Sequence, residues 1–197
     1  MRQLVLATNN EHKIREIRSL LKNLSVELLI LRDILNLPPL VEDGATFEEN
    51  AVKKATAVFQ HTGLPTLADD SGIEIFYLNM QPGVHSARYA GINATDEQNN
   101  EKLLQAMRGV APRRRRAQFR SVIALVDKGV QEITEGIFSG TLAEAPRGSN
   151  GFGYDPLFIP DGLSRTSAEL TDEEKNAISH RGQSLRKMIE VLQKRFA

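Results

Sequence analysis

Several polar stretches of the sequence combine residue types that bind phosphate. The first is Thr8-Asn9-Asn10-Glu11-His12-Lys13, which follows a short apolar run. Backbone N–H groups and the dipole at a helix start attract anions, and Thr, Asn and Lys side chains add hydrogen bonds and a positive charge. The segment lacks the glycine spacing of a Walker loop. An ordinary asparagine-rich helix cap with a surface lysine is the alternative.

Acidic residues elsewhere are candidate ligands for Mg²⁺. Asp69-Asp70-Ser71-Gly72 follows the apolar Thr66-Leu67-Ala68, and ligands of open α/β sheets gather at the carboxyl ends of strands. Mg²⁺ prefers oxygen ligands, and a cation would relieve the repulsion between adjacent carboxylates. Glu42 is a candidate third carboxylate and Lys54 a candidate phosphate ligand. A hydrogen-bonding turn, a solvated acid and a surface lysine are the respective alternatives.

Two further segments carry groups that suit a nucleobase. Gly151-Phe152-Gly153 places an aromatic ring between flexible residues, and a base can stack on such a ring. Tyr154-Asp155 follows with polar groups for the base edges. Ser179-His180-Arg181-Gly182 stands at a predicted break between helices, with Lys175 about one turn upstream, and an arginine fork suits purine O6 or N7. A core phenylalanine and an exposed helix junction are the alternatives.

Alternating strands and helices must position these segments. Apolar spacing predicts a strand over 3–7, a helix over 11–22 and a strand over 26–31, an opening that favours a sheet covered by helices. Capping boxes begin helices at Thr46, Thr95 and Thr171. We expect the remaining elements to be a strand over 66–68, a turn over 69–72, a strand over 73–78, a loop over 79–94, a hairpin of 117–126 with 130–138, a strand over 157–159 and a long C-terminal helix.

Composition limits the partners and the compartment. Of 197 residues, 41% are hydrophobic, which is typical of a soluble chain with one domain or two packed lobes. The 25 Lys and Arg balance the 25 Asp and Glu, so the net charge gives no attraction to nucleic acid or to an anionic membrane. Without cysteine, a thiolate metal site is impossible. No signal peptide or spanning segment is recognisable, so we expect a cytoplasmic protein without nucleic-acid or membrane partners. The run Arg113–Arg116 is interpreted as a solvated loop.

Six motifs follow one another along nearly the whole chain. They are Thr8-x-Asn10-x-x-Lys13, Thr46-Phe47-x-Glu49-Asn50-Ala51-x-x-Lys54-Ala55, Ala68-Asp69-Asp70-Ser71-Gly72, Pro82-Gly83-x-x-Ser86-Ala87-Arg88-Tyr89-x-Gly91, Gly151-Phe152-Gly153-Tyr154-Asp155-Pro156 and Glu173-Glu174-Lys175-Asn176-x-x-Ser179-His180-Arg181. In this order the motifs resemble the inosine triphosphate pyrophosphatase family, and its bacterial dITP/XTP pyrophosphatases in particular. Ser121 stands where related chains often have cysteine and is interpreted as a core detail.

The resemblance implies both a fold and a reaction. The fold would be one two-lobed α/β domain over residues 1–197, with a long mixed central sheet flanked by helices and an active-site cleft between the lobes. The reaction would be hydrolysis of ITP, dITP and XTP to the nucleoside monophosphate and pyrophosphate, with a Mg²⁺-activated water attacking the α-phosphorus. This removes aberrant purines before they enter DNA or RNA. The family is typically homodimeric.

The resemblance also implies roles for individual residues. The implied catalytic residues are Asp70 as general base, Asp69 in support, and Lys13 and Lys54 on the triphosphate. The implied Mg²⁺ ligands are Glu42 and Asp70, although the adjacent Asp43 leaves open which acid of the loop serves. The implied substrate-binding residues are Thr8, Asn9, Asn10, Glu11, His12, Lys13, Ser71, Phe152, Gly153, Tyr154, Asp155, Lys175, His180 and Arg181. Donors facing a 6-keto purine would be left unpaired by adenine, which would therefore be rejected.

Three other functions fit parts of the sequence. A nucleotide-binding module would need the phosphate lysines but not the carboxylates beside them. An RNA-associated protein would use Arg113–Arg116, with binding that weakens in salt. A related pyrophosphatase would act on pyrimidine or methylated nucleotides.

Overall fold

The computed structural model describes residues 2–196, which divide into two compact units. Of the described residues, unit 1 holds 2–70, 121–136 and 181–196, and unit 2 holds 71–120 and 137–180. Each unit has its own apolar core. No helix within the described range is long and apolar enough to cross a bilayer.

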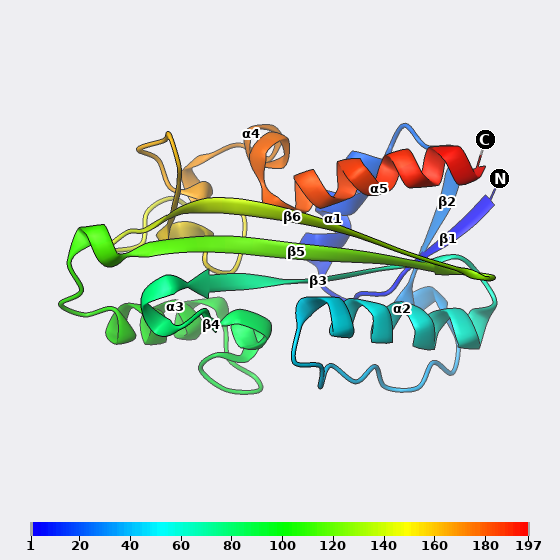
Figure 1. The fold of residues 1–197 in the computed structure, drawn as a ribbon, viewed down its shortest axis with the longest axis horizontal. Coiled ribbons are helices and arrows are strands. Elements are labelled where there is room, and N and C mark those ends of the chain that lie inside the picture. The colour runs from blue at the N-terminus through cyan, green and yellow to red at the C-terminus, as the bar shows by residue number, and fades with distance from the viewer. Residues whose placement is uncertain (1, 197) are drawn as a thin grey trace. The chain divides into compact units, whose positions relative to one another are not determined.

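Unit 1 is a β-α-β structure with helices on both faces of its strands (Figure 1). Its elements are β1 (Arg2–Leu6), α1 (Glu11–Leu21), β2 (Val26–Ile30), α2 (Phe47–Thr62) and all but the first residue of α5 (His180–Phe196). β1 pairs in parallel with β2. The apolar sides of α1 and α5 share one core with β1, to which Ile14, Ile17, Leu185 and Met188 contribute. α2 covers the opposite face of the strands (Figure 1).

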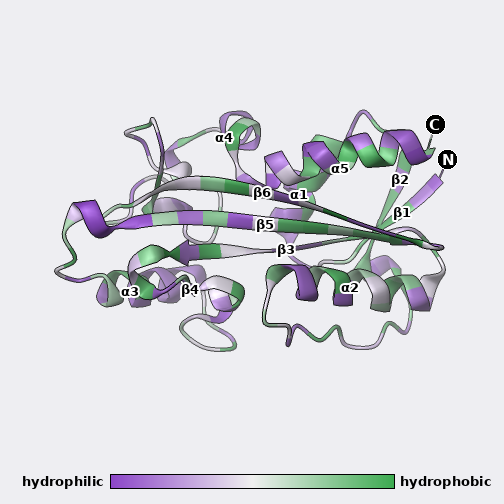
Figure 2. Cartoon of the chain, in the orientation of Figure 1, coloured by the Kyte–Doolittle hydropathy of each residue, from purple (hydrophilic) through white to green (hydrophobic). Residues whose placement is uncertain are grey.

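Unit 2 contains shorter elements and more irregular chain. They are β4 (Gln81–Pro82), α3 (Asp96–Ala106), β7 (Phe158–Pro160), α4 (Asp172–Ile178) and several 3₁₀ turns, including Gly83–Arg88 and Asp155–Leu157. Its core includes Leu103 and Met107 of the α3 region with Phe119, Phe138 and Phe158. The alternation of apolar and polar residues along the helices of both units is visible in Figure 2.

Three long strands contribute residues to both units. They are β3 (Thr66–Ile75), β5 (Arg116–Asp127) and β6 (Val130–Leu142). The sheet order is β2-β1-β3-β5-β6-β7, with β4 paired to β3. Parallel pairing of β1 with β3 and antiparallel pairing of β6 with β7 make the sheet mixed. The long mixed sheet flanked by helices is therefore confirmed.

The main departure from the sequence-based expectation lies in β3. We expected Gly72 to end a strand in a turn, but β3 runs unbroken through 69–72. A Cβ on Gly72 would lie 2.3 Å from Ser86 Oγ and 2.4 Å from Gly83 O, so the glycine permits close approach of a 3₁₀ turn. Ser86 Oγ also accepts the Ile73 N–H at 2.9 Å. Since strand side chains alternate, Asp69 and Asp70 project to opposite faces.

The capping predictions are confirmed to different degrees. Thr95 and Thr171 form complete capping boxes at the starts of α3 and α4. At α2 the Thr46 hydroxyl accepts the Glu49 N–H at 3.1 Å, but the Glu49 carboxylate accepts the Ala45 N–H instead of closing the box. The break before α5 falls at Ser179, as expected. The expected loop over 79–94 contains β4 and a 3₁₀ turn.

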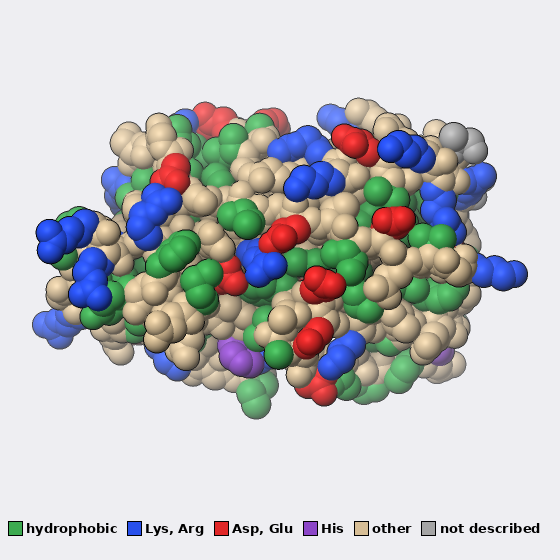
Figure 3. All heavy atoms as spheres, viewed as in Figure 1, with side chains coloured by type: hydrophobic (Ala, Val, Ile, Leu, Met, Phe, Trp, Pro, Cys, Tyr) green, Lys and Arg blue, Asp and Glu red, His purple; other side chains and the backbone are tan. Residues whose placement is uncertain are grey.

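The interpretation of Arg113–Arg116 as a solvated loop is wrong for one of its members. Arg115 is buried, and its guanidinium donates to three backbone carbonyls near the ends of α3 and β6. Arg116 forms a two-point ion pair with Asp161 at the surface. Carbonyl groups at the ends of elements are satisfied this way, which periodicity alone does not reveal. Elsewhere on the visible face, charges of both signs are interspersed (Figure 3).

Candidate active site

The Thr8–Lys13 segment forms the start of α1. Asn10 is the N-cap, and its Oδ1 accepts the N–H groups of His12 and Lys13 at 3.0 and 3.1 Å. Thr8 Oγ1 accepts the Asn10 N–H at 3.2 Å. Side-chain hydrogen bonds therefore fix the conformation of this turn without a ligand. The carboxamide oxygen of Asn10 serves the helix itself, while Lys13 projects toward β3 from the first turn.

On one face of β3, Asp69 is the centre of a buried ionic cluster. Lys13 Nζ lies 2.6 Å from Asp69 Oδ2, and Ser121 Oγ donates to Asp69 Oδ1 at 2.7 Å. Arg181 donates through Nε and Nη2 at 3.3 Å each, and its Nη1 donates to Glu16. Burial favours the neutral acid, but Arg181 and Lys13 outweigh it and hold the Asp69 pKa well below its usual value. The charged form of Asp69 is thus favoured, which suits it to fixing Lys13.

The sequence interpretation missed two members of this cluster, Glu16 altogether and Ser121 as a partner of Asp69. Ser121 is fully buried in β5, donates to Asp69 and lies 3.0 Å from Ser184 Oγ. A single hydroxyl leading the apolar run 122–126 was the available signal, because a buried hydroxyl needs a partner. The prediction that Ser121 is a core detail is therefore incomplete, since it holds a site carboxylate.

On the other face of β3, Asp70 meets residues from α2 and the preceding loop. Lys54 Nζ donates to Asp70 Oδ1 at 2.9 Å, to Glu42 Oε1 at 2.7 Å and to the Asp69 carbonyl at 2.9 Å. Asn50, one helical turn before Lys54, donates to Asp70 Oδ2 at 3.2 Å. Burial raises the Asp70 pKa, against the opposing effect of Lys54. Asp70 is therefore a stronger proton acceptor than an ordinary aspartate.

The pKa of Lys54 is raised, as is the pKa of its partner Asp70. Burial lowers the Lys54 pKa, but the two carboxylates of Asp70 and Glu42 outweigh burial. The Lys54 ammonium has two carboxylate partners, whereas Asp70 has to share its single ammonium with Glu42. The raised pKa of Lys54 and the raised pKa of Asp70 both follow from this arrangement.

The geometry favours Glu42 over Asp43 as a partner of Asp70. Glu42 and Asp70 bind the same ammonium, whereas Asp43 pairs with the exposed Lys53 at 2.8 Å. Within residues 2–196, no three carboxylate or histidine side chains gather into a ready-made cation site. A Mg²⁺ ion held by Glu42 and Asp70 would therefore complete its shell with water and phosphate oxygens, which is how this ion is usually bound.

In unit 2, Asp155 anchors residues 151–153, which we call the aromatic loop. Its Oδ2 accepts the Phe152 N–H at 2.9 Å and lies 2.6 Å from Lys175 Nζ. The Lys175 ammonium also lies 4.9 Å from the centre of the Phe152 ring. A Cβ on Gly151 would lie 2.2 Å from Asp155 Oδ2, and Gly151 has a positive φ of 72°, so only glycine suits this position. Asp155 is buried, and its predicted contact with the base stays a prediction.

Aromatic and backbone contacts fix two further predicted residues of unit 2. The His180 ring stacks on Phe119, with 4.9 Å between ring centres and 10° between planes. The Tyr154 hydroxyl donates to the Ser86 carbonyl at 2.8 Å, and burial raises the Tyr154 pKa. Ser71 lies half-buried in β3. These rings are thus held by the protein rather than projecting freely.

Arg181 belongs with the Asp69 cluster of unit 1 rather than with the residues around Phe152. Its side chain is 1% exposed and directed at Asp69 and Glu16. The other predicted residues of unit 1 are Thr8, Asn9, Asn10, Glu11, His12, Lys13, Glu42, Lys54, Asp69 and Asp70, and those of unit 2 are Ser71, Phe152, Gly153, Tyr154, Asp155, Lys175 and His180. The role of Arg181 toward a purine stays a prediction.

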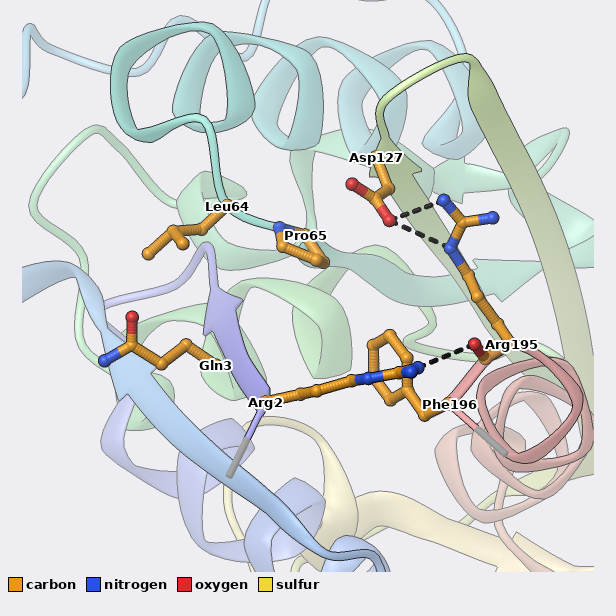
Figure 4. A pocket seen from close by; sticks show the side chains of 7 residues that line it. All are labelled: Arg2, Gln3, Leu64, Pro65, Asp127, Arg195 and Phe196. Atoms are coloured by element: carbon orange, nitrogen blue, oxygen red, sulfur yellow. Dashed lines mark hydrogen bonds and ion pairs between the residues drawn. The ribbon is translucent and has the colours of Figure 1, made fainter.

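A separate pocket in unit 1 contains none of these residues (Figure 4). Its volume is about 510 Å³, and it lies by the first residues of β1, the start of β3 and the end of α5. Arg2 lies over the Phe196 ring and donates to the Arg195 carbonyl at 2.8 Å, while Arg195 pairs with Asp127. Its polar groups thus largely satisfy one another. The pocket therefore differs in place from the charged residues described above: Lys13 lies in α1, after the carboxyl end of β1, and Asp70 lies within β3.

A family model covers almost the whole chain. The Ham1 family matches residues 4–191. The chain belongs to the Ham1 family. This match confirms the resemblance that the six motifs indicated.

Individual Ham1 relatives and solved structures agree in sequence and fold. The chain is 50% identical over 186 residues to the dITP/XTP pyrophosphatase of Geobacter sulfurreducens, and the alignment covers 94% of each chain. The structure of a HAM1 protein from Coxiella burnetii superposes with a TM-score of 0.90 at 45% identity, over 98% of this chain and 100% of that one. The Staphylococcus aureus Ham1 protein gives 0.89 at 37% identity, with the same coverages. The fold is therefore the Ham1 fold.

Proposed function

We propose that the protein hydrolyses the aberrant purine triphosphates ITP, dITP and XTP to the nucleoside monophosphate and pyrophosphate. The observation that carries the proposal is the arrangement at 69–70, where two adjacent carboxylates on opposite faces of β3 each bind a different lysine, Lys13 being partly buried and Lys54 buried. The names of the Ham1 relatives, dITP/XTP pyrophosphatases, support the substrate class. Hydrolysis would clear these nucleotides from the pool used for DNA and RNA synthesis.

Lys13 and Lys54 would bind the triphosphate. Burial lowers the Lys13 pKa despite Asp69, so a phosphate anion arriving beside this ammonium would stabilise its charged form. Lys54 has its own anions in Glu42 and Asp70, and these would hold Mg²⁺. When bound, Mg²⁺ neutralises phosphate charge and lowers the pKa of a bound water.

Asp70 would act as the general base. Its raised pKa makes the carboxylate a better acceptor for a proton from the attacking water. The water oxygen forms a bond to the α-phosphorus, the bond from this phosphorus to the bridging oxygen of pyrophosphate breaks, and the water proton passes to Asp70. Asp69, locked as an anion, would keep Lys13 in place throughout.

Unit 2 would bind the base. Phe152 would stack on the purine, and donors directed at the 6-keto group would be left unpaired by adenine. Guanine differs from hypoxanthine by its 2-amino group, so its rejection would depend on an unfavourable contact there. Lys175, which lies beside the Phe152 ring, would add positive charge near the keto oxygen of a bound base.

Pyrophosphate release tests the proposal most directly. We would assay ITP, XTP, GTP, ATP and dTTP with and without Mg²⁺, using wild type, Asp70→Asn and the control Asp43→Asn. Mg²⁺-dependent release from ITP and XTP, lost in Asp70→Asn and kept in Asp43→Asn, is expected. Release from dTTP in preference to ITP would indicate a pyrimidine enzyme. Nucleotide binding with no release from any substrate would indicate a binding module.

We also propose a homodimer located in the cytoplasm. The family resemblance supports the dimer, and the nucleotide pool that such an enzyme would serve supports the location. Sedimentation equilibrium of the purified chain would measure twice the mass of 21.9 kDa. A monomer at micromolar concentration would contradict this proposal without affecting the assigned reaction.

A further inference from the structure

Helix α3 holds both ends of one residue in the aromatic loop. The Gly153 N–H donates to Asp96 Oδ2 at 2.6 Å, and the Gly153 carbonyl accepts from Asn100 Nδ2 at 2.8 Å. Asp96 and Asn100 are one helical turn apart, so their side chains lie on the same side of α3. All these residues belong to unit 2. We call this arrangement the α3 clamp.

The loop needs an anchor at this position because of its glycines. Gly151 and Gly153 flank Phe152, and both have positive φ values, 72° and 62°. Glycine loses more conformational freedom on folding than any other residue, so unanchored glycines would leave the aromatic ring mobile. Asp155 fixes the N–H of Phe152. The α3 clamp fixes the following residue, Gly153.

Asn100 is buried and directs its amide donor at the Gly153 carbonyl. The residue is 9% exposed, and within residues 2–196 its Oδ1 has no hydrogen-bond partner. A buried acceptor without a partner is unfavourable, and an apolar residue of similar size would avoid this cost. Such a residue could not donate to the Gly153 carbonyl. The amide donor is therefore what this position contributes to the loop.

We propose that Asp96 and Asn100 are positioning residues that set the Phe152 ring for stacking on the purine base. This inference rests on the proposed base-binding role of Phe152. The clamp acts on unit 2, whereas Lys13, Lys54 and Asp70 belong to unit 1. Loss of the clamp therefore weakens nucleotide binding and base selection and leaves bond cleavage nearly intact, which appears as a raised KM at an unchanged kcat.

The first test compares steady-state kinetics on ITP in matched variants. Asp96→Ala removes the acceptor, and Asn100→Asp removes the donor without changing the side-chain shape. Asp96→Asn keeps an acceptor oxygen and should therefore preserve the hydrogen bond from the Gly153 N–H. Glu97→Ala is the control, because Glu97 is an exposed acid in the same first turn of α3 whose described hydrogen bonding is confined to the helix start. We expect KM to rise about tenfold in the first two variants, with kcat within about twofold, and no change in Asp96→Asn or Glu97→Ala.

The second test measures the loop without any nucleotide. The chain contains no tryptophan, so Phe152→Trp introduces a single fluorescent indole at the position in question. We expect its anisotropy to fall when Asp96→Ala or Asn100→Asp is added, and to stay constant with Glu97→Ala. An unchanged KM, or an indole that stays rigid in both clamp variants, would overturn the proposal. If wild type released no pyrophosphate from ITP, the proposed function would fail, and the anisotropy would still decide whether α3 fixes residue 152.

Discussion

The two faces of β3 hold neighbouring aspartates in opposite electrostatic states. Asp69 meets two cations and a hydroxyl, and its pKa falls well below the usual value. Asp70 shares a single ammonium with Glu42, and burial raises its pKa. Both side chains are buried, so burial does not distinguish them. The number of cations that contact each carboxylate distinguishes them. Because β3 directs the two side chains to opposite faces, identical neighbouring residues acquire different partners and opposite pKa shifts.

This difference yields a strong contrast in stability. Asp69→Asn leaves Lys13 and Arg181 with less anionic compensation in a buried cluster. We expect the free energy of unfolding to fall by about 3–5 kcal/mol. Asp70→Asn removes an acid whose charged form is disfavoured by the fold, so we expect its free energy of unfolding at pH 7 to be no lower than that of wild type. We expect its activity to fall about 100-fold or more. Urea denaturation and pyrophosphate release measure the two quantities. Equal destabilisation by both variants would remove the contrast.

The pH dependence of stability should separate the two residues by sign. The Asp69 pKa is depressed in the fold, so its stabilisation is present above the usual pKa of 3.8 and is lost as pH falls below it. The Asp70 pKa is raised, so its charge costs stability at neutral pH, and this cost disappears as pH falls through the raised pKa. Unfolding free energies of wild type, Asp69→Asn and Asp70→Asn between pH 3 and 7 would measure both differences. Differences from wild type of the same sign and pH profile would contradict the assignment.

The contribution of Ser121 sharpens the Asp69 side of the comparison. Ser121→Ala removes one donor to a buried anion, and we expect the unfolding free energy to fall by about 1.5–3 kcal/mol. Ser184→Ala is a matched control, because Ser184 contacts Ser121 and the Arg181 carbonyl in the same network without a described hydrogen bond to Asp69. A loss in Ser184→Ala as large as that in Ser121→Ala would attribute the effect to packing rather than to the carboxylate.

The Asp70 side is sharpened by the two adjacent acids of the preceding loop. Glu42→Gln removes one of the carboxylates bound to Lys54, and we expect the Mg²⁺ concentration for half-maximal activity to rise about tenfold. Asp43→Asn should leave it unchanged, because Asp43 pairs with an exposed lysine at the surface. Titration of pyrophosphate release with Mg²⁺ distinguishes the two, and a larger shift in Asp43→Asn would reverse the ligand assignment.

Local rules predicted the elements that local chemistry controls. Hydroxyl caps at Thr95 and Thr171, the turn at Lys128-Gly129 and the break at Ser179 all depend on a few neighbouring residues. β3 was divided wrongly because a glycine ends a strand in one context and admits a close neighbour in another. The partner that decides between them, Ser86, is distant in sequence.

In the candidate site too, local sequence indicated which residues matter, whereas their contacts depend on residues distant in sequence. Motif order identified the charged residues, but the pairing of Lys13 with Asp69 and of Lys54 with Asp70 depends on which face of the strand each acid occupies. Asn100 and Gly153 are 53 positions apart in the chain, and Arg115 reaches carbonyls up to 28 positions away. Neither contact leaves a periodic signal, so only the folded chain reveals it.

The interleaving of the two units also constrains how such a protein can be recombined. Unit 2 consists of residues 71–120 and 137–180, and the intervening 121–136 belongs to unit 1. A single crossover between two related genes would therefore always split at least one unit between parents. A chimera that exchanges unit 2 for that of a relative needs both stretches replaced together, with joins inside β3, β5 and β6 and a fourth after the first residue of α5.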